Sequence, residues 1–187
     1  MYVCAGNIEQ FSFAFSIGVG LCESIITLTQ LCEKKKPESL IFIGTAGSYS
    51  EEIKLLDLYT STSAMQIEIG FLEQKSYTPL NYEINSIKNV SCETIQKIKN
   101  KNLPEAMVNS SNFITRDSHH ASLLLQQKIL LENMEFFGIM SVAKRFRIPC
   151  LGVFCISNYC NSSAREDFLK NHHLAIEKLE EFVRGIK

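Results

Sequence analysis

Two short groups of residues in the C-terminal half of the chain have the types and positions needed for binding or catalysis. Glu135 follows Met134 at the start of a predicted helix, and Ser157 and Asn158 follow a run of apolar residues. A carboxylate in the first turn of a helix either stabilises the helix dipole or binds a ligand. Polar groups directly after a buried strand lie at its carboxyl end, where open α/β sheets bind ligands. The sequence therefore predicts a site near these residues.

Small residues mark two further points where a ligand could approach the backbone. The segment Gly44–Ser48 directly follows a predicted strand, Leu40–Ile43, and the hydroxyl of Thr45 would face the space beyond that strand. Gly18 and Gly20 precede a predicted helix. Glycines there either let backbone amides approach an anion at the helix N-terminus or simply allow a tight turn.

Alternating strand and helix patterns would hold these groups in place. Apolar residues recur every three or four positions from Phe136 to Phe146, which predicts a helix with one buried stripe. Arg145, Arg147 and Pro149 would end it, because cations suit a helix C-terminus and proline cannot continue the helix. The apolar run Cys150–Ile156 is typical of a strand buried on both faces. The other predicted elements are strands at Tyr2–Ala5, Phe11–Phe15, Leu40–Ile43, Leu58–Ala64, Gln66–Phe71 and Met107–Ser110, helices at Leu21–Lys34, Cys92–Lys99 (capped by Ser91), His119–Gln127 (capped by its histidines) and Ala164–Ile186, and a surface loop at Ser76–Asn89.

Composition narrows the class of protein. The chain has 187 residues, enough for one domain with a sizeable core, and we expect a single domain over residues 1–187. Nineteen basic and twenty acidic residues give a net charge of -1, so no basic field favours nucleic acid. No apolar run is long enough to span a membrane, and no signal peptide is evident. We therefore expect a cytoplasmic protein.

Cysteine and histidine spacing argues against a metal site. The seven cysteines include no CxxC pair, and most lie in apolar runs, which favours buried free thiols. Adjacent histidines, at 119–120 and again at 172–173, point to different faces of a helix and suit a shared metal poorly. We expect neither a metal nor another cofactor.

Five short motifs occur in a fixed order along the chain. They are Ser16–Gly20, Gly44–Gly47 after a buried strand, Asn112–Ile114, Asn133–Glu135 opening a helix, and Ile156–Asn158 ending the next strand. Together they resemble the nucleoside phosphorylase-type family, which comprises purine nucleoside phosphorylases, uridine phosphorylases and methylthioadenosine/adenosylhomocysteine nucleosidases. The likeness is greatest to short bacterial proteins described as purine nucleoside phosphorylases. It covers nearly the whole chain and implies a three-layer α/β/α sandwich with a mixed central sheet.

The resemblance also implies roles for individual residues in cleaving a ribosyl–base bond. Glu135 would bind the ribose hydroxyls, and Asn158 would hydrogen-bond the departing base. Phe113, which pattern alone would place in the core, would stack on the base. The remaining implied residues contact substrate (Ile114, Met134, Asn133, Ser157, Ala46 and Gly47) or the attacking phosphate or water (Thr45, Gly18, Gly20 and Glu9).

The sequence departs from the family pattern at three points. Many relatives have an aspartate where Asn158 stands, and an asparagine there goes with 6-oxopurines in the family. Phe42 stands where hexameric phosphorylases carry a phosphate-binding arginine, and Arg116 is the only arginine near a motif. Glu9 is the only acidic residue of the N-terminal loop, so it is the candidate to activate water if the enzyme is a hydrolase.

These features favour a purine nucleoside phosphorylase. Such a pentosyltransferase of purine salvage would cleave the N-glycosidic bond of a 6-oxopurine nucleoside, with phosphate as co-substrate, to give free base and ribose 1-phosphate. The alternatives are a purine nucleosidase acting on methylthioadenosine, adenosylhomocysteine or futalosine-type nucleosides, and a non-catalytic relative. The resemblance further implies a homo-oligomer, a dimer or a hexamer, with a neighbour's side chain often completing the site.

Overall fold

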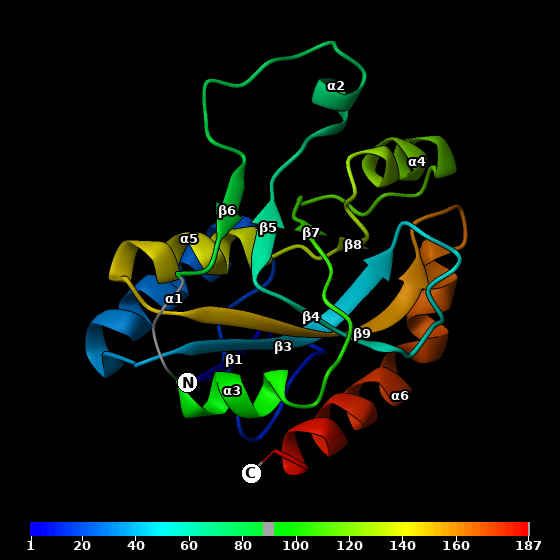
Figure 1. Cartoon of the computed structure of the whole chain (residues 1–187). Coiled ribbons are helices and arrows are strands. Elements are labelled where there is room, and N and C mark those ends of the chain that lie inside the picture. The colour runs from blue at the N-terminus through cyan, green and yellow to red at the C-terminus, as the bar shows by residue number, and fades with distance from the viewer. Residues whose placement is uncertain (88–91, 187) are drawn as a thin grey trace.

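The structure, a computed structural model, describes residues 1–87 and 92–186. The predicted helix cap Ser91 lies outside these residues. Figure 1 shows a central sheet with helices on both faces, which confirms the predicted three-layer sandwich. The strands are β1 (Tyr2–Cys4), β2 (Phe15–Ser16), β3 (Leu40–Ser48), β4 (Leu58–Ser61), β5 (Ser63–Met65), β6 (Glu83–Asn85), β7 (Val108–Asn109), β8 (Leu131–Glu132) and β9 (Cys150–Tyr159); the helices are α1 (Leu21–Lys35), α2 (Ile69–Leu72), α3 (Glu93–Lys99), α4 (Ser118–Gln126), α5 (Phe136–Phe146) and α6 (Ala164–Arg184).

The described strands form one mixed sheet of nine strands with β3 near its centre. β3 pairs in parallel with β1 on one side and with β9 on the other, and β1 also pairs in parallel with β2. The carboxyl ends of these four strands therefore meet at one edge. At that edge β8 pairs antiparallel with the last two residues of β3. This edge collects most of the predicted site residues.

Alternation along β3 explains why its apolar run is uninterrupted. Leu40 and Phe42 pack on the side covered by α1 and α5, whereas Ile41 and Ile43 pack on the side covered by α6. Successive side chains of a strand point to opposite faces, so a strand between two helical layers is apolar at every position. Phe42 is fully buried, with its ring 5.6 Å from that of Phe154. The residue in the position of the missing phosphate-binding arginine therefore belongs to the core.

β3 and β9 are both longer than predicted, and their pairing is irregular at the site. Ala46 pairs with Ile156, but the next residue, Gly47, pairs with Asn158, so Ser157 is an extra residue in β9. Such bulges redirect side chains and are common beside active sites. The segment predicted to follow the strand, Gly44–Ser48, is part of β3 itself.

Helix α5 begins and ends close to the predicted positions. Its apolar stripe is buried, and the chain leaves the helix through Arg147, whose φ of 56° is left-handed. Asn133 caps its start, because the Asn133 Oδ1 accepts hydrogen bonds from the amides of Glu135 and Phe136 at 3.0 and 2.9 Å. Glu135 therefore precedes the first helical residue instead of lying within the first turn.

Several predictions of local structure were wrong. Phe11–Phe15 is mostly a turn, and only its last residue enters β2. Gln66–Phe71 is not a strand, since α2 begins within it, and the predicted loop Ser76–Asn89 contains β6. Asp117, not the histidines, caps α4 by accepting from two backbone amides. All seven cysteines are free thiols, but Cys22 is exposed.

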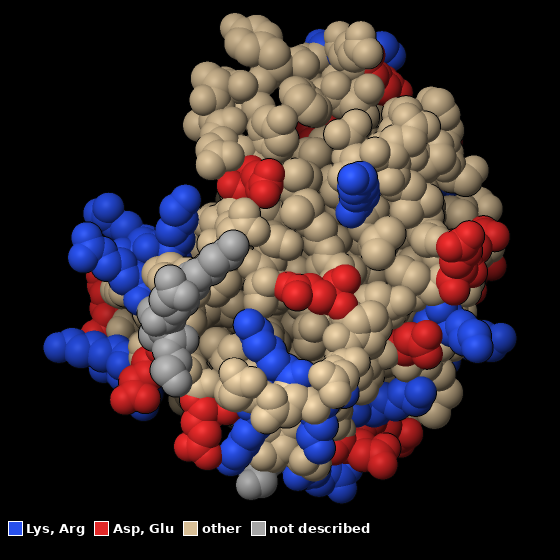
Figure 2. All heavy atoms as spheres, in the orientation of Figure 1, with Lys and Arg blue, Asp and Glu red and all other residues tan. Residues whose placement is uncertain are grey.

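The surface shows no single charged field on the face in view. In Figure 2 basic and acidic side chains are interspersed around the lower part of the molecule, while the uppermost part carries only a few of either sign. None of the helices in the described residues is both long and apolar enough to cross a membrane.

Candidate active site

A cavity of about 500 Å³ opens at the edge where β1, β3, β8 and β9 end. It contains ten of the residues predicted from the sequence. Three carboxylates face it, two of which had been predicted as site residues. The lining residues are Ala5, Gly6, Asn7, Ile8, Glu9, Val19, Thr45, Ala46, Gly47, Ile114, Arg116, Glu132, Asn133, Met134, Glu135, Ser157, Asn158, Ala164, Arg165, Phe168 and Leu169.

Glu9 is held against the middle of β3. Its carboxylate accepts hydrogen bonds from both the backbone amide (3.3 Å) and the hydroxyl of Thr45. Burial raises the pKa of Glu9, an effect opposed by the bonds from Thr45 and by the nearby His172. A buried carboxylate with a raised pKa can accept a proton during a reaction near neutral pH.

Glu135 reaches across the cavity floor to the loop before α1. Its Oε1 accepts a hydrogen bond of 2.8 Å from the amide of Gly20, and only 3% of the residue is exposed. Burial raises the pKa of Glu135 to about 7, and the charge of Glu9 adds to that effect. The two carboxylates are therefore close enough to influence one another.

Gly20 is needed at this contact for two reasons. Its φ is +82°, which favours glycine, and a Cβ there would lie 2.8 Å from the Asn112 Oδ1. The same Asn112 oxygen accepts from the amide of Leu21 at 2.9 Å. Neither Gly18 nor Gly20 lines the cavity. Gly20 serves the site through its amide, which binds Glu135, whereas Glu23 fills the space beside Gly18.

Asn133 and Met134 connect Glu135 to the sheet. Besides capping α5, Asn133 donates from Nδ2 to the carbonyl of Thr45 at 3.1 Å. Both of its polar atoms are therefore used within the protein, so this contact fixes the position of Glu135 relative to β3. Met134 lies between the two glutamate-bearing segments and lines the cavity.

Asn158 and Ser157 lie at the end of β9. Ser157 Oγ donates to the Asn158 Oδ1 at 2.8 Å, and Asn158 Nδ2 donates to the carbonyl of Tyr159 at 3.2 Å. A Cβ on Gly47 would lie 3.0 Å from that Nδ2 and 2.8 Å from the sulfur of Cys160. The absence of a side chain at Gly47 leaves the Asn158 amide accessible from the cavity.

The segment after β7 forms a further wall. Ile114 and Arg116 line the cavity, and Arg116 Nη2 donates to the carbonyl of Ser162 at 3.1 Å. Phe113, predicted to stack on the base, is 78% exposed and is not among the lining residues. The structure therefore does not bring Phe113 to the other predicted residues.

Sequence reasoning missed part of the site. The sequence predicted a helix at Ala164–Ile186 with no site residue on it, yet Ala164, Arg165, Phe168 and Leu169 on the first turns of α6 line the cavity. Arg165, like Arg116, adds a cation at the cavity wall. The periodic pattern of α6 could not reveal this role, because the same residues also form an ordinary amphipathic helix start. Within residues 1–87 and 92–186, no three His, Cys, Asp or Glu side chains form a group suited to a metal.

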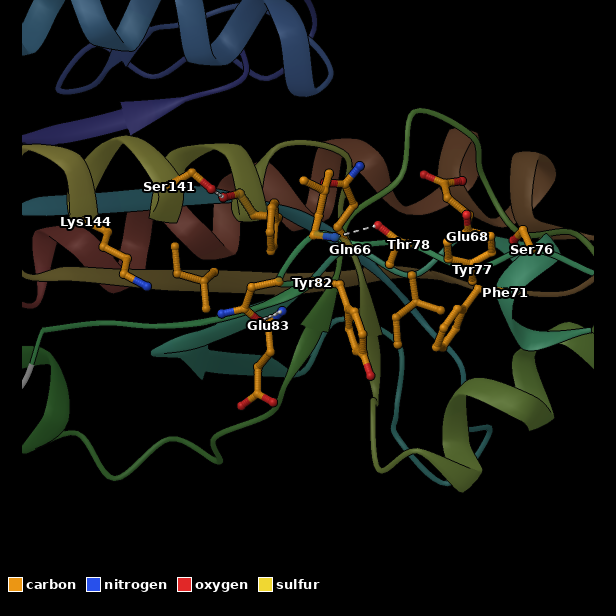
Figure 3. Close-up of a pocket in the computed structure, with 15 residues that line it drawn as sticks. Gln66, Glu68, Phe71, Ser76, Tyr77, Thr78, Tyr82, Glu83, Ser141 and Lys144 are labelled. Atoms are coloured by element: carbon orange, nitrogen blue, oxygen red, sulfur yellow. Dashed lines mark hydrogen bonds between the residues drawn. The ribbon is translucent and has the colours of Figure 1, made fainter. Parts of the chain in front are cut away.

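A second cavity of about 390 Å³ lies between α5 and the segment from Gln66 to Ile84. Figure 3 shows Ser141 and Lys144 at one end of it and Phe71 and Ser76 at the other. Its two acidic side chains, Glu68 and Glu83, are exposed. It therefore lacks the paired buried carboxylates that distinguish the first cavity.

Comparisons with known proteins agree with this architecture. The profile of the Phosphorylase superfamily matches residues 2–186. The chain belongs to this superfamily. The chain is therefore related to enzymes that break nucleoside N-glycosidic bonds, as the sequence motifs indicated.

The named relatives are nucleosidases. The 5'-methylthioadenosine/S-adenosylhomocysteine nucleosidase of Listeria welshimeri is 27% identical over 173 residues, covering 86% of this chain and 74% of that protein. The enzyme of the same name from Buchnera aphidicola is 23% identical over 184 residues, covering 93% and 78%. A solved structure of the S. pneumoniae enzyme of that name, with a transition-state inhibitor, superposes with a TM-score of 0.80 at 14% identity, covering 99% of this chain and 96% of that chain.

These comparisons correct the predicted function. We had favoured a phosphate-dependent purine nucleoside phosphorylase, a transferase, on the basis of Asn158 and the likeness to short bacterial proteins described as purine nucleoside phosphorylases. The relatives and structural neighbours are hydrolases by name, so this prediction was wrong and the alternative reading is better supported. The identity of the single residue Asn158 does not decide whether phosphate or water attacks the sugar.

Proposed function

We propose that this protein is a purine nucleosidase that uses water to hydrolyse the N-glycosidic bond of a methylthioadenosine- or adenosylhomocysteine-type nucleoside. The observation that carries the proposal is the contact between Glu9 and Thr45. The amide and hydroxyl of Thr45 are the donors expected to bind an attacking anion, and both already donate to the Glu9 carboxylate.

The charges near Glu9 and Thr45 favour water over phosphate as the attacking group. Glu9 and Glu135 place two carboxylates on the same side of the cavity, and each raises the cost of bringing an anion there. β3 has no arginine to offset the negative charge of these carboxylates. Phe42, at the position where hexameric phosphorylases carry an arginine, packs in the core. Arg116 and Arg165 lie on other walls of the cavity, contributed by the segment after β7 and by α6.

In the proposed reaction Glu9 accepts a proton from the attacking water as the water oxygen bonds to C1′ of the sugar. The C1′–N9 bond breaks, and its electron pair leaves with the purine. Glu135 binds the ribose hydroxyls and holds the ring where positive charge develops, while Met134 packs against the sugar. Ile114, Ser157, Ala46 and Gly47 complete the substrate contacts.

Asn158 stabilises the leaving base without donating a proton to it. Its Nδ2 has a second hydrogen available beyond the one directed to Tyr159, and this hydrogen can bond to a purine ring nitrogen. The proton that the departing base needs comes from solvent in this scheme. The reaction requires no metal or organic cofactor.

The test is release of free base from methylthioadenosine, adenosylhomocysteine, adenosine and inosine, each with and without phosphate. The proposal predicts base release at equal rates in both conditions. A strict requirement for phosphate would overturn it, and absence of release from every nucleoside would favour a non-catalytic relative.

We also propose that the active form is a homo-oligomer in the cytoplasm. Four apolar side chains that line the cavity remain largely exposed in the single chain, with exposed fractions of 57% for Ile8, 42% for Val19, 58% for Ile114 and 64% for Leu169. A second copy packed over this rim would bury them and close the cavity. Light scattering should give a mass of at least two chains, and a monomer at working concentration would contradict the proposal.

A further inference from the structure

Glu132 is a buried carboxylate of the cavity that the proposed reaction does not use. It is 5% exposed and lines the cavity beside Asn133. Its Oε1 accepts from the amide of Thr115 at 2.9 Å and from the sulfur of Cys160 at 3.7 Å, and its Oε2 accepts from the phenol of Tyr49 at 2.8 Å and from the Thr115 hydroxyl. Four donors from three segments therefore converge on one side chain.

The groups that bond to the Glu132 carboxylate are all uncharged. In the described parts of the chain, none of the ion pairs involves Glu132. A carboxylate has about four acceptor positions, and here all of them are occupied from within the protein. Glu132 therefore has no acceptor position left for a substrate, and its function must be exerted through the residues that it holds.

The residues bonded to Glu132 lie next to two residues that line the cavity. Thr115 donates twice to Glu132, and its two neighbours, Ile114 and Arg116, both line the cavity. Arg116 in turn donates to Ser162, two residues after Cys160. The segment 114–116 and the turn after β9 are thus held in fixed relation to one another.

Strand pairing on both sides fixes the position of Glu132. In β8 it pairs with Gly47 of β3 on one side and with Asn109 of β7 on the other. A side chain on a paired central strand is held more rigidly than one on a loop. The segment 114–116 has no strand or helix of its own. Its hydrogen bonds to Glu132 therefore restrain it relative to the sheet.

We infer that Glu132 is a positioning residue for the base-binding wall: through Thr115 it fixes Ile114 and Arg116 at the distance that a purine needs. This inference rests on the proposed nucleosidase function for the identity of the ligand. It predicts weaker ground-state binding with turnover largely kept, whereas loss of a group that acts only in the transition state lowers kcat.

The experiment measures kcat and KM for methylthioadenosine and the dissociation constant of free adenine by calorimetry. Glu132→Gln replaces acceptor positions by an amide that opposes the bound donors. It should raise KM and the adenine dissociation constant about tenfold or more, with kcat changed by less than about threefold.

A second pair of variants, at Thr115, tests the same contact if Glu132→Gln does not fold. Thr115→Val removes one donor to Glu132 and should raise KM about three- to tenfold, whereas Thr115→Ser keeps the hydroxyl and should restore wild-type values. The matched control is Glu105→Gln, because Glu105 also accepts from a threonine hydroxyl, that of Thr62, but on the exposed surface away from the cavity. It should change neither constant.

Either of two results would overturn the inference. Unchanged adenine affinity in folded Glu132→Gln and Thr115→Val would remove Glu132 from the binding wall. A large loss of kcat at constant KM would make it a participant in the chemistry. If wild-type protein binds adenine but hydrolyses no nucleoside, the proposed function fails while the adenine titrations still decide the role of Glu132.

Discussion

Two buried carboxylates of the cavity, Glu132 and Glu135, differ in how many donors hold them. Glu132 receives four hydrogen bonds from Tyr49, Thr115 and Cys160, so its charge is fully distributed among donors. Glu135 is as deeply buried but depends on the Gly20 amide and on Asn133, and its pKa is raised to about 7. Equal burial therefore produces a structural group in one place and a reactive group in the other.

Glu132 and Glu135 differ because different groups surround their carboxylates. The side of the cavity near Glu132 is built from hydroxyl, thiol and phenol groups that point inward from three segments. Glu135 has fewer donors, and the charge of Glu9 adds to the burial that raises its pKa. A buried carboxylate with a raised pKa is suited to acid–base chemistry near neutral pH.

The largest effect should come from Glu9→Gln. The account assigns to Glu9 the proton transfer from water, a step worth about 100- to 10,000-fold in rate. We expect kcat for nucleoside hydrolysis to fall within that range, while adenine affinity stays close to wild type. A Glu9→Gln enzyme with normal turnover would show that Glu9 does not take the proton from the attacking water.

The stability of the protein should depend on pH through Glu135. Its pKa is near 7 in the folded state and near 4.5 when exposed, so folding takes up a proton between these values. The contribution of this group is fully present below about pH 4.5 and is lost as pH rises to about 7. From pH 5 to pH 8 the unfolding free energy of the wild type should fall by about 2.5 kcal/mol relative to Glu135→Gln.

Denaturant unfolding of both proteins at the two pH values measures this difference. The comparison with the variant removes the contribution of every other titrating group. Parallel pH dependence of wild type and Glu135→Gln would mean that the carboxylate is as well solvated as an exposed one, which would contradict the contrast with Glu132.

Glu135→Gln should also lower turnover by at least about tenfold, because an amide binds developing positive charge on the ribose less well than a carboxylate. Steady-state kinetics with methylthioadenosine measure the loss. Glu105→Gln serves here too as a surface control with unchanged kinetics. Unchanged turnover in Glu135→Gln would remove this residue from the site.

The smallest effect should come from Asn158→Asp, a change at the end of the cavity floor. A carboxylic acid can donate a proton to the base, whereas the amide can only hydrogen-bond. We expect the ratio of kcat/KM for adenosine over inosine to rise by about three- to tenfold. An identical substrate profile in the variant would mean that Asn158 does not face the base.

Periodicity and strand ends predicted most of the helices and strands and a site near Thr45, Glu135, Ser157 and Asn158, whereas the three layers and the other cavity residues were implied by the family resemblance. Cys150–Ile156 and Phe136–Phe146 were recognisable because their apolar patterns are long and regular. The predicted strands Phe11–Phe15 and Gln66–Phe71 failed because short alternating runs also occur in turns. Motif order then assembled Glu9, Thr45 and Glu135 in one place, although they are far apart in the chain.

Other features could not be read from the sequence, since they depend on tertiary contacts. Glu132 stands between the apolar Leu131 and the polar Asn133. Nothing in this stretch of sequence indicates that Tyr49, Thr115 and Cys160, which are distant in the chain, donate to its carboxylate. Phe113 follows the motif Asn112–Ile114 but points into solvent, so a motif located the segment without fixing its side-chain direction.

The most direct test of the central claim is hydrolysis of methylthioadenosine in ¹⁸O-labelled water containing phosphate, with the sugar product analysed by mass spectrometry. The account predicts methylthioribose carrying one ¹⁸O atom and no sugar 1-phosphate, because Glu9 occupies the donors of Thr45 and directs water to C1′. Formation of methylthioribose 1-phosphate without label would show that phosphate reaches C1′ despite Glu9, and would contradict the account.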